Sequence, residues 1–205
     1  MIFVMKEINW NEQWELHAPN FREGHAHINL AQFGGPPTSY RLLPGAGFGD
    51  LSHPTTQIMM RLLPKEITCD VIDIGCGSGV LSIGAKLLGA KNVYGLDIDS
   101  LSIEHAEKNA LLNGLNIYFG EKLHSIPLSN PLILMNMISS EQKIAWKSLP
   151  ELHQISKKMI VSGVLEVDRK SFLEACGLKY GICVQELSYK GWLGFVFMSE
   201  ASSKL

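Results

Sequence analysis

The chain has 205 residues, of which 46% are hydrophobic and 19% charged, enough for one folded α/β domain with a modest extension. A formal net charge of −2 provides no general attraction to nucleic acid or to an anionic membrane. No apolar run reaches the length of a signal peptide or a membrane span. We therefore expect a cytoplasmic protein that makes no direct contact with nucleic acid or membrane.

The cysteines and the N-terminal histidines lack the spacing of a metal site. His17, His25 and His27 have no cysteine or carboxylate at ligand spacing, so a hydrogen-bonded surface set is expected. No two cysteines form a C-x-x-C pair, which favours reduced thiols and no metal. The four cysteines are Cys69, Cys76, Cys176 and Cys183.

The first 43 residues are predicted to form an extension that precedes the main domain, which spans residues 44–205. Within this extension, the pattern predicts a short helix over residues 9–16 and a strand over residues 40–43. The extension is therefore expected to lead directly into the first loop of the main domain.

Residues 44–49 form a loop too rich in glycine to continue a strand or to begin a helix. After this loop, Ser52 or His53 can cap a helix whose first turn contains Pro54. Because the glycines allow few packing contacts and the helix needs a ligand over its N-terminus, we predict that residues 45–54 are mobile without a ligand and ordered with one.

The next segment predicts a strand, a tight turn and a helix. Residues 69–74 are apolar and β-branched like a buried parallel strand; Gly75, Gly77 and Gly79 follow, and helical spacing begins at Val80. Glycines at such a turn let the backbone bend sharply and let a ligand approach bare N–H groups at the positive end of a helix. We therefore expect a small polar ligand here.

Two details narrow the class of ligand. The dinucleotide-binding pattern requires a small residue where this chain has Val80, so the Gly-x-Gly-x-Gly order favours the methyltransferase variant. The next predicted strand, residues 91–96, ends at Asp97, 22 residues after Gly75. That spacing suits a carboxylate that accepts hydrogen bonds from both ribose hydroxyls. A purely structural turn is the alternative.

Helices and strands continue to alternate through the rest of the chain. Ile103, Ala106 and Ala110 are the expected buried face of the next helix, and Asn136 ends a strand. In order, the elements are a helix from Asp99 or Ser100 to 113, strands 115–119 and 131–135, helix 140–156, strand 158–162, helix 168–175, and strands 182–188 and 192–198. The last two strands should form a hairpin. The predicted fold is α/β, Rossmann-like, with a seven-stranded mostly parallel sheet, helices on both faces and an antiparallel C-terminal hairpin.

With these elements in place, the chain resembles the class I S-adenosylmethionine-dependent methyltransferases, and more narrowly the PrmA family, which methylates ribosomal protein L11. The resemblance covers roughly residues 8–198. His53-Pro54-Thr55-Thr56 together with the glycine motif is more specific than either alone. The matching segments are 44–49, 53–56, 71–81, 95–99, 136–137 and 162–165.

The resemblance implies a site for S-adenosylmethionine. Thr56 would face the cofactor from the lid helix, Asp97 would hold the ribose, and Glu121 would reach the adenine. Asn136 would bind beside the sulfonium methyl group and act as the catalytic residue, because its side-chain carbonyl can accept a hydrogen bond from an incoming amine. The other implied cofactor-binding residues are Asp73, Gly75, Cys76, Gly77, Gly79 and Ile98.

Two departures from the family bear on the acceptor. The family places a substrate-binding domain ahead of the segment with Trp10 and Trp14, and this sequence begins about where that domain would end. Asp50-Leu51-Ser52 stands where the family prefers Thr-Gly-Thr. The expected function is PrmA-like N-methylation of a protein lysine or amino group, with a ribosomal protein as one possible partner.

Three alternatives stay open. The first is a methyltransferase for a small molecule or another protein lysine, and the second is an inactive cofactor-binding module that serves as a partner protein. A nucleotide-dependent oxidoreductase is disfavoured by Val80. A base substrate is disfavoured because Asn136 is not followed by a Pro-Pro-aromatic run. His53 and Glu121 are candidates to assist the transfer.

Overall fold

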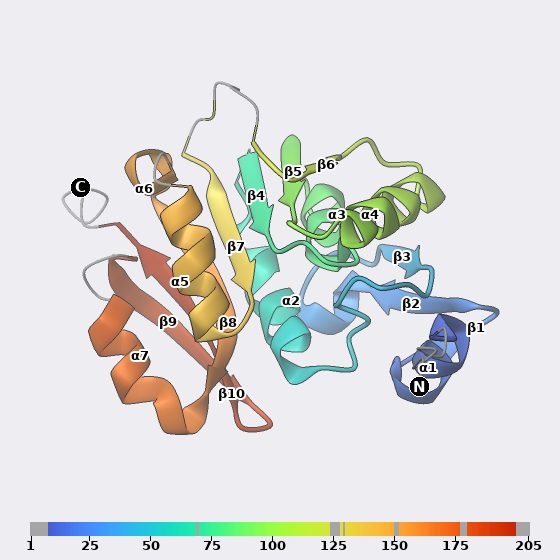
Figure 1. The fold of residues 1–205 in the computed structure, drawn as a ribbon, viewed down its shortest axis with the longest axis horizontal. Helices are drawn as coiled ribbons and strands as arrows, with labels where there is room; N and C mark the ends of the chain where they lie inside the picture. The colour runs from blue at the N-terminus through green and yellow to red at the C-terminus, as the bar shows by residue number, and fades with distance from the viewer. Residues whose placement is uncertain are drawn as a thin grey trace, which may run out of the picture.

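The structure, a computed structural model, describes residues 8–68, 70–123, 128, 130–149, 152–176 and 180–199. A seven-stranded sheet with helices on both faces forms the main body. A three-stranded antiparallel sheet, formed by the N-terminal region, lies beside it (Figure 1). The predicted α/β class is therefore confirmed.

The N-terminal region contains a small sheet that the sequence pattern did not predict. The helix predicted over residues 9–16 and the strand predicted over residues 40–43 are both confirmed to within about a residue. The Asn9 side chain caps this helix by accepting from the Glu12 amide. Buried and half-buried side chains alternate along the second strand, β2, so that Ala26 and Ile28 pack into the main core. The elements are α1 (Trp10–His17), β1 (Phe21–Arg22), β2 (His25–Asn29), the 3-10 helix η1 (Leu30–Phe33) and β3 (Ser39–Leu42).

The main sheet has the order β6-β5-β4-β7-β8-β10-β9. Its first five strands are parallel, and β10 pairs antiparallel with both β8 and β9. The strands are β4 (Asp70–Ile74), β5 (Asn92–Leu96), β6 (Tyr118–Gly120), β7 (Leu132–Asn136), β8 (Lys158–Leu165), β9 (Ile182–Tyr189) and β10 (Trp192–Met198). The chain builds outward from β4 to β6 and then returns to β7, so the carboxyl ends of β4 and β7 meet at a switch point.

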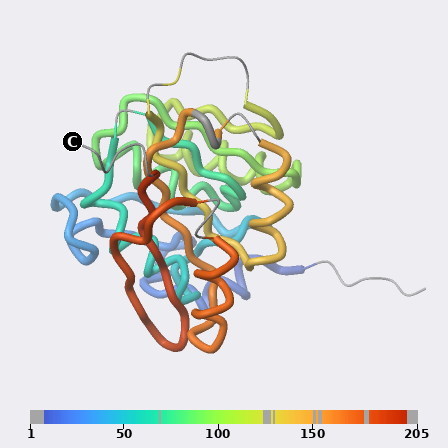
Figure 2. The backbone as a smooth tube through the Cα atoms, turned by 90° about the vertical axis from the view of Figure 1, so that its left-hand side faces the viewer, coloured from blue at the N-terminus to red at the C-terminus, as the bar shows by residue number. Residues whose placement is uncertain are grey.

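Two hydrophobic clusters cover the two faces of this sheet. One cluster packs β2, β3, α2, α3 and α4 against it, and the other packs α5, α6 and α7 on the opposite face. Figure 2 views the molecule from the side of the β9–β10 hairpin, with α7 beside it. The helices are α2 (Pro54–Glu66), α3 (Val80–Leu87), α4 (Ser100–Leu112), α5 (Ser139–Ser148), α6 (Leu152–Ile155), the 3-10 helix η2 (Glu166–Asp168) and α7 (Arg169–Cys176).

Several predicted boundaries were wrong. The single helix expected over residues 140–156 is two helices, α5 and α6. The sequence places Pro150 between them, and a proline inside a helix removes a backbone donor and clashes with the preceding turn. Strand β6 begins at Tyr118 instead of residue 115, and β8 continues to Leu165 because it pairs with β10.

Candidate functional site

The turn after β4 requires glycine at three positions. Gly75, Gly77 and Gly79 have φ angles of 72°, 55° and 77°, in the left-handed region that side chains rarely adopt. A Cβ atom on Gly75 would lie 2.5 Å from the Met137 Cε, and one on Gly77 would lie 2.5 Å from the Phe48 carbonyl oxygen. The backbone conformation disfavours larger residues at all three positions, and at Gly77 the backbone of Phe48 also leaves no room for one.

The expectation that the turn presents bare amides to a ligand was wrong. Each N–H from Gly75 to Gly79 donates to a partner within the protein, with N···O distances of 2.7–3.0 Å. The amides of Gly75 and Cys76 donate to the Leu96 carbonyl, Gly77 to the Asp97 carboxylate, Ser78 to the Phe48 carbonyl and Gly79 to the Cys76 carbonyl. Four of these bonds lie within the turn or join it to the end of β5, and the fifth, to Phe48, comes from the loop before α2, residues 44–53, which folds back over the turn. We refer to this loop as the lid.

Two polar side chains on α4 hold the lid and Leu43, the residue that precedes it. Nε2 of His105 donates to the Leu43 carbonyl at 2.7 Å, and Nδ1 accepts from the Gly47 amide at 3.1 Å. Asn109 accepts from the Leu43 amide at 2.7 Å and donates to the Ser78 carbonyl at 2.8 Å. The lid therefore has more contacts than its glycine content suggested.

The predicted buried face of α4 was incomplete. The two predicted alanines are buried, but Ile103 is only half-buried, and His105 and Asn109 are buried beside them. Asn113 extends the row by pairing with both backbone groups of Arg41. The spacing of four residues between these polar side chains was the signal that they share one face. Burial lowers the pKa of His105, so its ring is neutral with the proton on Nε2.

The lid segment that departs from the family adopts an unusual backbone. Leu51 has a φ angle of 69°, yet its side chain is only 2% exposed. Asp50 Oδ1 accepts from the Ser52 amide at 2.8 Å, and Gln57 Nε2 donates to the Leu51 carbonyl at 2.8 Å. Leucine thus occupies a conformation that suits glycine, and burial with local hydrogen bonds holds it there.

The lid leads into α2 as the sequence predicted. His53 caps the helix, accepting at Nδ1 from the Thr55 amide at 3.3 Å, and Pro54 occupies the first turn. Thr56 is fully buried, and its Oγ1 accepts from Asn136 Nδ2 at 3.3 Å across the switch point. The structure therefore brings together two predicted site residues that lie 80 positions apart in the sequence.

Asn136 leaves one hydrogen-bonding atom unused. Its Oδ1 is buried and has no partner among the residues that the structure describes. A buried acceptor without a donor costs roughly 1–3 kcal/mol, so such atoms are uncommon and require an explanation, such as a bound water molecule or ligand. The atom lies at the carboxyl end of β7, where folds of this class bind ligands.

The ribose and adenine residues implied by the resemblance lie at the ends of β5 and β6. Asp97 accepts from the amides of Gly77 and Asp99, each at 3.0 Å, and its own amide donates to the Gly120 carbonyl. A carboxylate offers about four acceptor positions, so roughly two remain for a ligand. Ile98 is 93% exposed, and Glu121, which follows the end of β6, is also exposed.

Asp73 and Cys76 lie under the turn. Asp73 is 1% exposed and accepts from Ser82 Oγ at 2.6 Å; burial raises the pKa of its carboxyl to about 7. Cys76 is 4% exposed, and burial raises the pKa of its thiol well above the usual range. Neither side chain is presented to solvent, so Cys76 is a neutral thiol and not a nucleophile.

An aromatic wall that the sequence did not predict borders the start of α2. The His53 ring makes edge-on contacts with Phe48 and Trp192, at centroid distances of 5.6 and 4.8 Å. Burial lowers the pKa of His53, which favours the neutral imidazole. Phe48 is 53% exposed, so this wall is open to solvent on one side.

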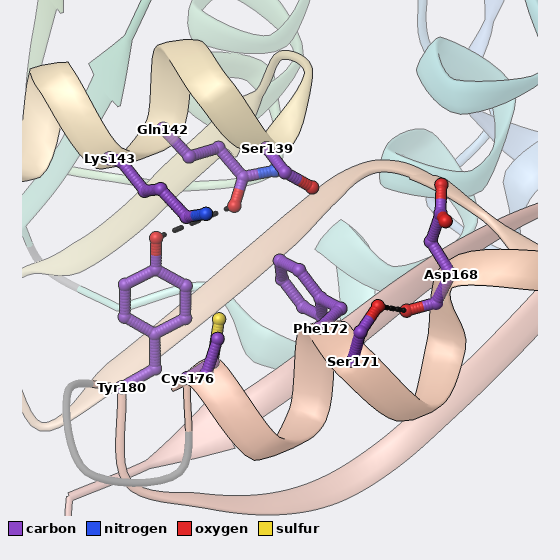
Figure 3. Close-up of a pocket in the computed structure, with 9 residues that line it drawn as sticks. Ser139, Gln142, Lys143, Asp168, Ser171, Phe172, Cys176 and Tyr180 are labelled. Carbon is purple, nitrogen blue, oxygen red and sulfur yellow. Dashed lines mark hydrogen bonds between the residues drawn. The ribbon is translucent and has the colours of Figure 1, made fainter.

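A separate pocket of about 190 Å³ lies between α5 and α7 (Figure 3). It contains none of the residues predicted for cofactor or catalysis. Among the described residues, no group of three or more His, Cys, Asp or Glu side chains could hold a metal ion. In the same ranges, no helix is long and apolar enough to cross a membrane. Cys76 and Cys183 are free thiols, and Cys69 lies outside the described residues.

Comparison with known proteins identifies the family. The family model described as ribosomal protein L11 methyltransferase (PrmA) matches residues 3–199. The chain belongs to the PrmA family. It is 33% identical over 190 residues to the ribosomal protein L11 methyltransferase of Hahella chejuensis, covering 84% of this chain and 62% of that protein. The enzyme of Dictyoglomus thermophilum is 32% identical over 213 residues, covering 96% of this chain and 68% of that protein.

Solved structures agree with this PrmA assignment. The crystal structure of ribosomal protein L11 methylase from Lactobacillus delbrueckii subsp. bulgaricus matches with a TM-score of 0.65 and 28% identity, covering 78% of this chain and 84% of that chain. TrmK of M. capricolum, solved with S-adenosyl-homocysteine, shares the fold at a TM-score of 0.53 and 17% identity, covering 68% of this chain and 66% of that chain. The chain spans 60–62% of the length of two curated PrmA relatives, from Teredinibacter turnerae and Hahella chejuensis.

Proposed function

We propose that this PrmA-family chain is an S-adenosylmethionine-dependent methyltransferase that acts on an amino group of a protein, with a ribosomal protein as the first acceptor to test. The observation that carries the proposal is the buried, unpartnered Oδ1 of Asn136, held beside Thr56 at the switch point of the sheet. A cytoplasmic location and the absence of direct nucleic-acid contact belong to the same proposal.

The residues present fit the cofactor. Asp97 has acceptor positions left for the two ribose hydroxyls, and Ile98 offers an exposed apolar surface on which the adenine can lie. Glu121 follows β6 at the same edge and would meet the adenine amino group. When bound, S-adenosylmethionine supplies an electrophilic methyl group on a sulfonium centre.

Methyl transfer to an amine is an in-line displacement, so the main tasks of the protein are alignment and exclusion of water. Asn136 Oδ1 would accept a hydrogen bond from the neutral amine and so direct its lone pair. An amide has no basic site at ordinary pH, so Asn136 orients the amine without deprotonating it. In His53, Nδ1 already accepts from Thr55, so Nε2 carries the ring proton; His53 forms part of the wall and is not a base.

A second candidate function is cofactor binding without catalysis, as a partner module. It is favoured by the lid, which lies on the glycine turn and occupies the Ser78 amide. Incubating the protein with tritiated S-adenosylmethionine and a ribosomal protein extract distinguishes the two functions. Transfer of label to a protein supports the enzyme, whereas cofactor binding without transfer to any extract component supports the silent module.

Asp97→Ala should weaken S-adenosylmethionine binding strongly. Hydrogen bonds to a charged group contribute about 1.5–3 kcal/mol each, so the loss of one such bond corresponds to roughly a tenfold or greater rise in Kd. Calorimetry on the wild type, Asp97→Ala and Asp97→Asn measures this, with NAD as a ligand expected not to bind. Asp97→Asn is the matched control because it keeps an acceptor for the Gly77 amide. Unchanged affinity in the alanine variant would remove the ribose assignment.

Asn136→Ala should lower turnover by orders of magnitude while the Kd for the cofactor stays within a few-fold. The reason is that a hydrogen bond made mainly in the transition state affects the rate constant and not ground-state affinity. Turnover, Kd and melting temperature are measured on the same preparation. If Asn136 serves only the strand end, the variant melts early; a variant that keeps full turnover also contradicts the catalytic role.

A further inference from the structure

Gln142 of α5 connects the ends of two strands beside Asn136. Its side chain is 1% exposed, and Nε2 donates to the carbonyls of Met137 at 2.7 Å and Ser162 at 3.1 Å. Its Oε1 accepts from the Tyr180 hydroxyl at 3.4 Å, a contact visible in Figure 3. The reverse orientation of the amide would point Oε1 at two carbonyls, so the partners fix which atom is nitrogen.

The two carbonyls lie just where the pairing of β7 with β8 ends. Asn136 and Ser162 are the last paired residues of these strands, and Met137 is the next residue along the chain. Gly163 approaches so closely that a Cβ atom there would overlap the Met137 carbonyl. A nitrogen with two hydrogens can serve two carbonyls at once, and a glutamine amide provides it without burying a charge.

The side chain of Asn136 has little else to fix its orientation. Within the described residues its side chain makes one hydrogen bond, the 3.3 Å contact with Thr56, and Oδ1 has no partner there. The position of Oδ1 therefore depends on the backbone at the end of β7. That backbone is braced by Gln142 through the adjacent Met137 carbonyl.

We propose that Gln142 is a positioning residue that holds the end of β7 so that Asn136 Oδ1 meets the acceptor amine. The proposal rests on the proposed function, in which Asn136 orients the amine. Gln142 contacts neither cofactor nor acceptor and acts only through Asn136. A purely structural glutamine would instead stabilise the packing of α5 on the sheet and leave the chemistry of each folded molecule unchanged.

The test compares Gln142→Met with Tyr180→Phe. Methionine matches glutamine in length and removes both donors, whereas Tyr180→Phe removes only the hydroxyl that donates to Oε1. We expect Gln142→Met to lower kcat by about 10- to 100-fold, the range that a small misplacement of a reacting group costs. The Kd for S-adenosylmethionine should stay within about twofold, and Tyr180→Phe should keep nearly full kcat. Activity is followed by label transfer from tritiated cofactor to a ribosomal protein extract.

A double-mutant cycle separates positioning from stability. If Gln142 acts through Asn136, the double variant Gln142→Met/Asn136→Ala should have the same kcat as Asn136→Ala alone. If the two substitutions instead lower kcat by factors that multiply in the double variant, the proposal is wrong. So would an unchanged kcat in folded Gln142→Met, because the brace would then have no influence on the acceptor site.

A readout without cofactor or acceptor keeps this test independent of the proposed function. The side-chain amide signal of Asn136 in nitrogen-15 NMR is assigned by its loss in Asn136→Ala. It should shift or broaden in Gln142→Met and stay unchanged in Tyr180→Phe; an unchanged signal in both overturns the brace. Gln142→Asn, which keeps the amide on a shorter side chain, is the second variant. If both Gln142 variants fail to fold, Gln142 is a stability residue and the proposal is wrong.

Discussion

At the scale of single residues, Leu51 has a backbone conformation that usually belongs to glycine. Its φ angle is 69° while its side chain is 2% exposed, so backbone strain and apolar burial act in opposite directions. A left-handed conformation costs a residue with a side chain roughly 1–2 kcal/mol.

Leu51→Gly should therefore be more stable than Leu51→Ala, by up to about 1 kcal/mol, although both lose the buried leucine. Glycine relieves the strained φ angle and alanine does not, while the larger entropy of glycine in the unfolded state offsets part of the gain. Urea unfolding of the two variants measures the difference directly. Gln57→Ala in each background tests whether the bond to the Leu51 carbonyl helps to hold the conformation. An alanine variant as stable as the glycine variant would show that the site carries no strain.

At the scale of elements, the lid depends on a neutral histidine on α4. Nδ1 of His105 accepts from the Gly47 amide, and a protonated ring would point a second N–H at that donor. Because burial lowers the pKa of His105 in the folded protein, its contribution is complete above the ordinary value of 6.5 and decreases as the pH falls below it. His53, whose pKa is also lowered by burial, acts in the same direction.

We therefore expect the lid to open more readily in mild acid. Limited chymotrypsin cleavage at Phe48, which is 53% exposed, should accelerate below about pH 6.5 relative to an unfolded reference peptide. His105→Gln, which does not titrate at this position, should cut at a rate that depends less on pH, with the remaining dependence due to His53. His53→Asn keeps an acceptor at the helix cap and isolates the contribution of His53. A wild-type rate that stays flat between pH 5 and pH 8, relative to the reference, would contradict a histidine-held lid.

At the scale of the whole molecule, the sequence predicted features set by neighbouring residues. The mostly parallel sheet needed only the alternation of helix and strand, and the cap at His53 needed only its local pattern, whereas the strand order was not predicted. By contrast, His105 and Gln142 bond to backbone groups 62 and 20 residues away. A backbone carbonyl has the same chemistry in every residue, so the sequence carries no sign of which side chain will meet it. The contacts between the lid and the glycine turn could therefore not be predicted from the sequence.

Asp73 affects the stability of the whole molecule because its carboxyl is buried in the central strand β4. Burial is the main cause that raises its pKa from 3.8 to about 7; hydrogen bonds with Ser82 oppose this rise, and nearby Asp97 adds to it. Between those two pH values the folded chain binds more protons at this site than the unfolded chain, so the free energy of unfolding falls as the pH rises. This loss of stability, the burial penalty of Asp73, is absent below pH 3.8 and complete above about pH 7.

Asp73→Asn should remove this penalty while keeping an acceptor for the Ser82 hydroxyl. The stability of the variant relative to the wild type should therefore rise between about pH 4 and pH 7, with a ceiling of about 4 kcal/mol, and level off at higher pH. Urea unfolding at one-unit pH steps measures the difference, in which the other titrating groups cancel. Ser82→Ala removes the bond that lowers the pKa, so its penalty should extend to higher pH than in the wild type. If the free energies of unfolding of the wild type and Asp73→Asn change with pH in parallel, Asp73 remains ionised in the core and the Ser82 bond outweighs burial.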